Sequence, residues 1–119
     1  MKPQHNPPIF REDFNSIEDI MESFEINCTD LDGVKIIFAW YGCGCYDGST
    51  FVLFEKDKKL YEVNGWHHSG FNLSGQWEPE ETTKEALFAR IKDGSLGKDG
   101  LFRGDMFASE LSQILEMIS

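Results

Sequence analysis

Three apolar stretches in the middle of the chain decide the fold: Val34-Lys-Ile-Ile-Phe-Ala-Trp-Tyr41, Phe51-Val-Leu-Phe-Glu55 and Leu60-Tyr-Glu-Val-Asn64. They are rich in β-branched and aromatic residues, and the segments between them are polar or rich in glycine, as turns are. The middle stretch is apolar at both odd and even positions, which is typical of a strand with neighbours on both sides. We therefore predict a three-stranded antiparallel meander with residues 51–55 in its centre.

The first of these strands also predicts which side chains share a face, because successive residues of a strand point to opposite sides. One face is expected to carry Val34, Ile36, Phe38 and Trp40. Ile37 and Ala39 are expected on the other face.

Helical periodicity begins before the strands and returns after them. The first helix follows Ser16, with Asp19 three residues later as in a capping box. Its apolar positions are Ile17, Ile20, Met21 and Phe24. A second helix is predicted to open with Thr82 as its cap and Glu85 three residues later, and to stop at Gly94. A third is predicted from about residue 105 to 118, with an apolar stripe at Phe107, Leu111, Ile114, Leu115 and Ile118.

Strands in one block with helices outside it predict an α+β fold of two layers, in which the meander packs against about three helices. A chain of 119 residues has room for one such domain. Three prolines near the N-terminus indicate that residues 1–14 form a flexible lead-in, so the domain is expected to span residues 15–119.

The chain is strongly acidic, with a formal net charge of −10 from 21 acidic and 11 basic side chains. Such a charge disfavours direct binding of nucleic acid, which requires clustered Lys and Arg, and attracts a basic protein surface instead. Residues 12–32 hold eight carboxylates and no Lys or Arg. The candidate partner-binding residues are Glu18, Asp19, Glu22, Glu25, Trp77 and Glu78. The alternative is that the acids serve solubility and that Trp77 folds back to cover the sheet.

Several features favour a cytoplasmic protein that does not cross a membrane. No stretch approaches the roughly 20 apolar residues that a spanning helix needs. Residues 1–10 contain prolines where a secretory leader has a basic segment and an apolar run. Three cysteines, an odd number, do not suggest a framework of disulfides.

One cluster of polar residues is expected at an edge of the sheet. In a meander the end of the first strand and the end of the third strand lie at the same edge, which brings Cys43 and Cys45 near His67 and His68. Thiolate and imidazole are the ligands of tetrahedral zinc sites, although the one-residue gap between the cysteines is tighter than usual. Zinc is therefore the one cofactor that the sequence suggests. Alternatively, the cysteines are small residues of a glycine-rich turn and the histidines bond to the backbone.

No pattern assigns a catalytic residue. The chain has no phosphate-binding Walker loop, no GxGxxG after a strand, no HExxH and no GxSxG. A nucleophilic pair of Cys45 and His67, with Asp47 to orient it, has no support in the spacing. The sequence thus favours a protein without catalytic activity over an enzyme.

Residues 51–64 and the later segment Gly75-Gln-Trp-Glu-Pro-Glu-Glu-Thr-Thr83 resemble a family of small uncharacterised phage and prophage proteins. The resemblance extends from about Tyr41 to Ile91, and the family carries a pattern like HCSCYGLxxQWEPEETT after the third strand. This chain departs from that pattern, because His68 and Gly70 stand where the family has cysteines. The resemblance implies an accessory protein of a mobile element.

Together these observations predict a phage-type binding protein that contacts a host or phage protein through an acidic surface, for example to inhibit a host defence system. The first alternative is a small zinc-binding domain that uses Cys43, Cys45, His67 and His68. The second is a small enzyme of unknown reaction.

Overall fold

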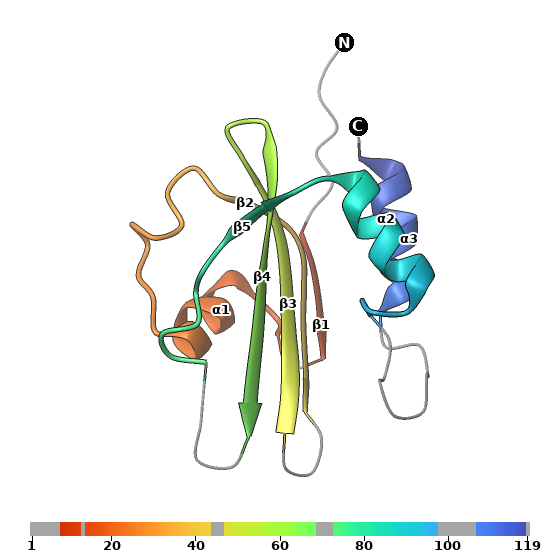
Figure 1. Ribbon diagram of the computed structural model, residues 1–119. Coiled ribbons are helices and arrows are strands. Elements are labelled where there is room, and N and C mark those ends of the chain that lie inside the picture. The colour runs from red at the N-terminus through yellow and green to blue at the C-terminus, as the bar shows by residue number, and fades with distance from the viewer. Residues whose placement is uncertain (1–7, 13, 44–46, 69–72, 98–106, 119) are drawn as a thin grey trace. The chain divides into compact units, whose positions relative to one another are not determined.

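The computed structural model describes residues 8–12, 14–43, 47–68, 73–97 and 107–118 (Figure 1). The chain divides into two compact units, Met1–Glu81 and Thr82–Ser119. The first unit carries the sheet and one helix, and the second carries two helices. The prediction of an α+β protein is therefore confirmed.

The sheet is larger than the predicted meander. Its five strands lie in the order of the chain and are β1 (Ile9–Glu12), β2 (Lys35–Cys43), β3 (Asp47–Lys56), β4 (Lys59–His68) and β5 (Glu80–Thr82). β2, β3 and β4 form the antiparallel meander, with β3 central as predicted. β1 adds a parallel strand beside β2, so the sheet is mixed. The expectation of only three strands was wrong because β1 lies in the proline-containing lead-in and β5 is three polar residues long.

Helix α1 (Ile17–Phe24) covers one face of the sheet (Figure 1). Ile20 and Phe24 are fully buried and join a cluster of side chains from β2, β3, β4 and the segments around them. The buried members of this cluster are Phe14, Ile20, Phe24, Ile36, Ala39, Val52, Phe54, Val63 and Leu73. Burial of a large apolar side chain stabilises a fold by about 1.5–3 kcal/mol, so this cluster holds α1 on the sheet.

An irregularity in β2 overturns the predicted assignment of its faces. The pairing of β2 with β3 shifts between Ile36 and Phe38, which makes Ile37 an extra residue in the strand. A bulge of one residue reverses the alternation beyond it. Ile36 and Ala39 consequently face α1 together, while Phe38 and Trp40 lie on the opposite face.

The link between β3 and β4 is a two-residue turn. Lys56 pairs with Lys59, which leaves Asp57 and Lys58 at the tip with φ of 55° and 67°. Two successive residues with positive φ match the type I′ turn of tight hairpins, a conformation that usually selects Asn-Gly or Asp-Gly. Lys58 therefore occupies a position that disfavours a residue with a Cβ.

The start of α1 follows the predicted capping box. The Ser16 hydroxyl accepts a hydrogen bond from the N–H of Asp19 at 3.4 Å. The Asp19 carboxylate in turn accepts from the N–H of Asn15 at 2.7 Å. At the other end, Glu25 adopts the left-handed conformation, with φ of 58°, and its N–H donates to the carbonyl of Met21. Local polar groups thus fix both ends of a helix only eight residues long.

The second unit contains α2 (Lys84–Asp93) and α3 (Ala108–Met117). The cap of α2 is Thr83, whose hydroxyl accepts from the N–H of Ala86 at 3.0 Å, so the predicted cap at Thr82 was one residue early. Thr82 instead ends β5. Gly94 ends α2 as predicted, with φ of 88°. Most of the apolar stripe predicted for the last helix is buried, namely Phe107, Leu111, Ile114 and Leu115.

Two contacts connect the ends of these helices. The carbonyl of Gly97 accepts hydrogen bonds from the N–H groups of Phe107 and Ala108 at 3.0 and 3.1 Å. The Lys84 ammonium donates to the carbonyl of Ile118 at 2.7 Å, at the C-terminal end of α3 where a cation is favourable. Across the described part of the chain, none of the helices has the length and apolar character needed to span a membrane.

Candidate functional site

Two exposed carboxylates stand on the outer side of α1. Glu18 and Glu22 are exposed, whereas Ile20 and Phe24 of the same helix are buried against the sheet. Glu18 and Glu22 are four residues apart, so they lie one turn apart on the same side of the helix. We call this pair the acidic helix face.

Two further predicted residues of α1 have partners within the protein. The Asp19 carboxylate accepts from the N–H of Asn15, as described above. Glu25 accepts a hydrogen bond from the hydroxyl of Ser74 at 3.1 Å, which links the end of α1 to the segment after β4. These carboxylates therefore contribute to the fold whether or not they also meet a partner.

Trp77 packs onto the sheet. Its ring centroid lies 5.2 Å from that of Phe24 in an edge-on arrangement and 5.8 Å from that of Phe54 in a stacked one. The side chain is half-buried against the core cluster. Its neighbour Glu78 is exposed. Trp77 thus covers the edge of the core, as the alternative interpretation of the sequence expected.

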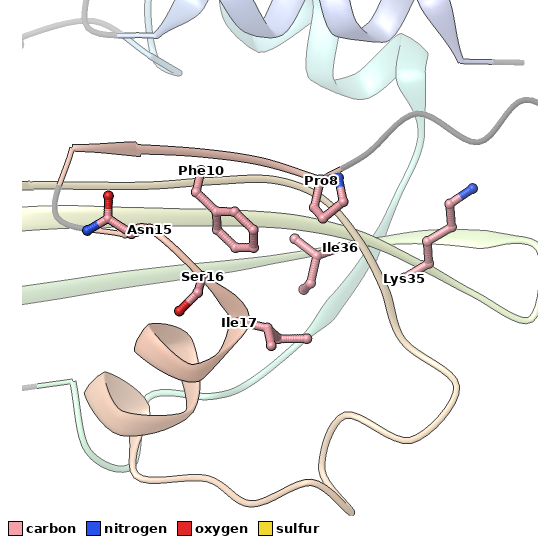
Figure 2. Close-up of a pocket in the computed structure, with 7 residues that line it drawn as sticks. All are labelled: Pro8, Phe10, Asn15, Ser16, Ile17, Lys35 and Ile36. Atoms are coloured by element: carbon pink, nitrogen blue, oxygen red, sulfur yellow. The ribbon is translucent and has the colours of Figure 1, made fainter.

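A pocket of about 320 Å³ lies between β1, the start of α1 and the start of β2 (Figure 2). The side chains of Phe10, Ile17 and Ile36 point toward one another there. The lining residues are Pro8, Phe10, Asn15, Ser16, Ile17, Lys35 and Ile36. The volume is at the lower end of the range of small-molecule pockets and is ample for one large side chain.

Three of the residues that line this pocket are polar: Asn15, Ser16 and Lys35. Asn15 and Ser16 form one wall, and the Asp19 carboxylate accepts from the backbone N–H of Asn15. The Lys35 side chain extends away from the Phe10 ring in Figure 2, as expected for the strand neighbour of the inward-facing Ile36. Two charged groups beside the lining residues are held by hydrogen bonds: the Asp19 carboxylate, which accepts from the N–H of Asn15, and the Arg11 guanidinium, which donates to the carbonyl of Phe10 at 3.0 Å.

Sequence reasoning did not find this pocket, because its β1 wall belongs to the segment that was assigned to the lead-in. The available signal was the apolar pair Ile9 and Phe10, which stands just before the first helix. The pairing of Phe10 with Ala39 could not be predicted, because β1 and its partner β2 are far apart in the sequence.

The backbone brings two of the predicted metal ligands to one edge of the sheet. Cys43 of β2 and His67 of β4 both pair with Gly48 of β3, so the three residues form one row across the strands. His68 pairs with Asp47 in the next row. Cys45 and the side chains of Cys43, His67 and His68 lie outside the described residues. Among the described side chains, no three His, Cys, Asp or Glu gather as metal ligands.

The described part of the sheet contains two buried polar side chains, Glu62 and Thr50, that the sequence analysis did not single out. Glu62 is only 4% exposed, and its carboxylate accepts a hydrogen bond from the Asn64 amide at 2.7 Å. The hydroxyl of Thr50 is buried and has no hydrogen-bond partner among the described residues. The position of Glu62 in the alternation of β4, opposite in sense to Tyr61 and Val63, was the signal for its face.

Comparison of the chain with protein-family models, with curated proteins and with solved structures finds no match. The structural features that bear on function are therefore the pocket, the acidic helix face and the row of Cys43, Gly48 and His67 at the edge of the sheet.

Proposed function

We propose that this protein is a binding module without catalytic activity that contacts a basic protein partner through α1. The observation that carries the proposal is the acidic helix face, Glu18 and Glu22, exposed on a helix whose other side is buried. The chain supplies no Lys or Arg between residues 12 and 34 to neutralise it.

The distribution of charge supports the same proposal. Fifteen of the 21 acidic side chains, but only six of the 11 Lys and Arg, belong to Met1–Glu81. The field of such a unit favours approach of a positively charged surface and raises the association rate at low salt. Each exposed ion pair adds only about 0.2–1 kcal/mol, so we expect binding that weakens markedly as salt is added.

A role as a phage or prophage accessory protein is part of the proposal and rests on the resemblance of residues 51–64 and 75–83. Inhibition of a host defence system is one form that such binding takes. An acidic module that occupies the basic surface of a host protein would block that surface without any chemical step.

The experiment that tests the proposal compares two charge-reversed proteins as baits for binding partners. In the first, Glu18→Lys and Glu22→Lys reverse the acidic helix face. In the control, Glu85→Lys and Glu116→Lys change two exposed acids of the second unit, so both proteins have the same net charge. A partner that is retained by the wild type and the control but lost by the α1 variant supports the proposal. Equal losses in the two variants would show that only overall charge matters.

The zinc-binding alternative keeps one specific observation in its favour, the row formed by Cys43, Gly48 and His67. Backbones two strands apart are separated by about 9–10 Å, a span that a Cys and a His side chain on opposite sides of a metal can bridge. Native mass spectrometry of untagged protein, with and without a chelator, tests it. One bound zinc that is absent from Cys43→Ser would support this alternative, and an unchanged metal-free mass would remove it.

A further inference from the structure

We infer that the pocket beside α1 receives an apolar side chain of the basic partner segment. The inference rests on the proposed function and adds to it the anchor that fixes the position of the partner. It follows from the place of the pocket, whose wall at Asn15, Ser16 and Ile17 leads directly into Glu18 of the acidic helix face.

The apolar part of the site is built to hold a side chain. Ile36 is buried, at 4% exposure, and forms the floor, while Phe10 and Ile17 are half-buried and form the walls. These three side chains converge from β2, β1 and α1 respectively (Figure 2). An apolar group inserted between them removes more of Phe10 and Ile17 from water as well as burying its own surface, which is the usual role of an interface anchor.

The charges around the pocket select a basic segment. The Asp19 carboxylate is held against the wall by the N–H of Asn15 at 2.7 Å, and Glu18 follows the lining residue Ile17 in the chain. Lys35, the basic residue of the lining, directs its side chain away from the Phe10 ring (Figure 2). Arg11 donates to the carbonyl of Phe10 at 3.0 Å, but as the next residue of β1 it belongs to the opposite face of the strand. A segment with Lys or Arg on either side of the apolar residue therefore matches the local field.

Two synthetic peptides with blocked ends probe the site: Arg-Lys-Leu-Lys-Arg and the same peptide with Ser in place of Leu. Each is titrated into ¹⁵N-labelled full-length protein at low salt, and amide shifts are followed by NMR. We expect the Leu peptide to bind roughly tenfold more tightly, a factor that corresponds to about 1.4 kcal/mol. We also expect its largest shifts at Phe10, Ile17 and Ile36, with the Ser peptide shifting mainly Glu18 and Glu22.

A substitution in the pocket gives an independent measurement. Ile17→Trp fills the space and should abolish the preference for Leu, whereas Met21→Trp, one turn further along α1 and outside the lining, should retain it. Equal binding of the two peptides by the wild type, with no shifts in the pocket, would overturn the inference while leaving the acidic helix face in use. Binding that is unaffected by Glu18→Gln with Glu22→Gln would instead count against the proposed function.

Discussion

The two-residue turn between β3 and β4 offers a direct test of how the backbone of this protein is stabilised. Lys58 has φ of 67° at a position that closes the hairpin between the paired residues Lys56 and Lys59. In this conformation the Cβ of a residue crowds the neighbouring carbonyl, at a cost of about 1–2 kcal/mol. Glycine avoids that cost but loses about 0.5–1 kcal/mol through the greater freedom of its unfolded chain. Lys58→Gly should therefore raise the free energy of unfolding by about 0.5–1 kcal/mol.

The measurement is the urea unfolding midpoint, supported by a thermal melt in which we expect an increase of roughly 2–4 °C. Lys58→Ala is the control, because it removes the same charge next to Lys56 and Lys59 but keeps the Cβ. If Lys58→Ala stabilised the protein as much as Lys58→Gly, relief of charge repulsion would explain the gain and the argument from φ would be refuted. A loss of stability in Lys58→Gly alone would refute it as well.

Two further predictions concern the second unit. Gly97→Ala should lower the free energy of unfolding, measured by urea titration, by about 2–4 kcal/mol, because φ is 80° and the new Cβ would lie 2.7 Å from the backbone nitrogen of Ala108. Gly94→Ala is the control: φ is 88° but no atom lies within 4 Å of the new Cβ, so the loss should be only about 1–2 kcal/mol. The Ser95 side chain and the Ser95 N–H, which donates to Asp93 Oδ1 at 2.8 Å, hold the pKa of the Asp93 carboxyl below the ordinary 3.8. The stability that they add is present above that pH and is lost as the pH falls through the lower folded-state pKa. An NMR titration of the Asp93 carboxyl should show its midpoint return toward 3.8 in Ser95→Ala, and an unchanged midpoint would contradict this cause.

The elements that could be predicted from the sequence are those whose signals are local. Ser16 and Gly94 mark helix ends by hydrogen bonding and by a backbone conformation that depend on a few neighbouring residues. The three middle strands have continuous apolar patterns, and their turns are short, so the meander follows from adjacent segments. The closeness of Cys43 and His67 in the backbone could be predicted for the same reason, because the ends of the first and third strands of a meander lie at the same edge of the sheet.

The features that escaped prediction depend on distant pairing or on residues that satisfy two patterns at once. Ile37 is apolar like its neighbours, so the sequence gives no sign of the bulge. The register of β2 against β3 nevertheless shifts at this residue. β1 is four residues long, and only its pairing with β2, more than twenty residues later, makes it a strand. The pocket depends on that pairing, and the apolar pair Ile9 and Phe10 does not indicate by itself which strand it pairs with.

The bulge at Ile37 also determines where the chain can change in length. Deletion of Ile37 would bring β2 back into simple alternation and leave both of its faces as they are, because Ile36 and Phe38 already lie on opposite faces. Deletion of a regular residue such as Ala39, with the bulge kept, would instead put Trp40 on the face that contacts α1. A residue added or removed in the loop between Glu25 and Val34 would leave both faces of β2 unchanged. Natural homologues of this protein should accordingly vary in length before β2, and a change of length within Lys35–Cys43 should fall at the position of Ile37.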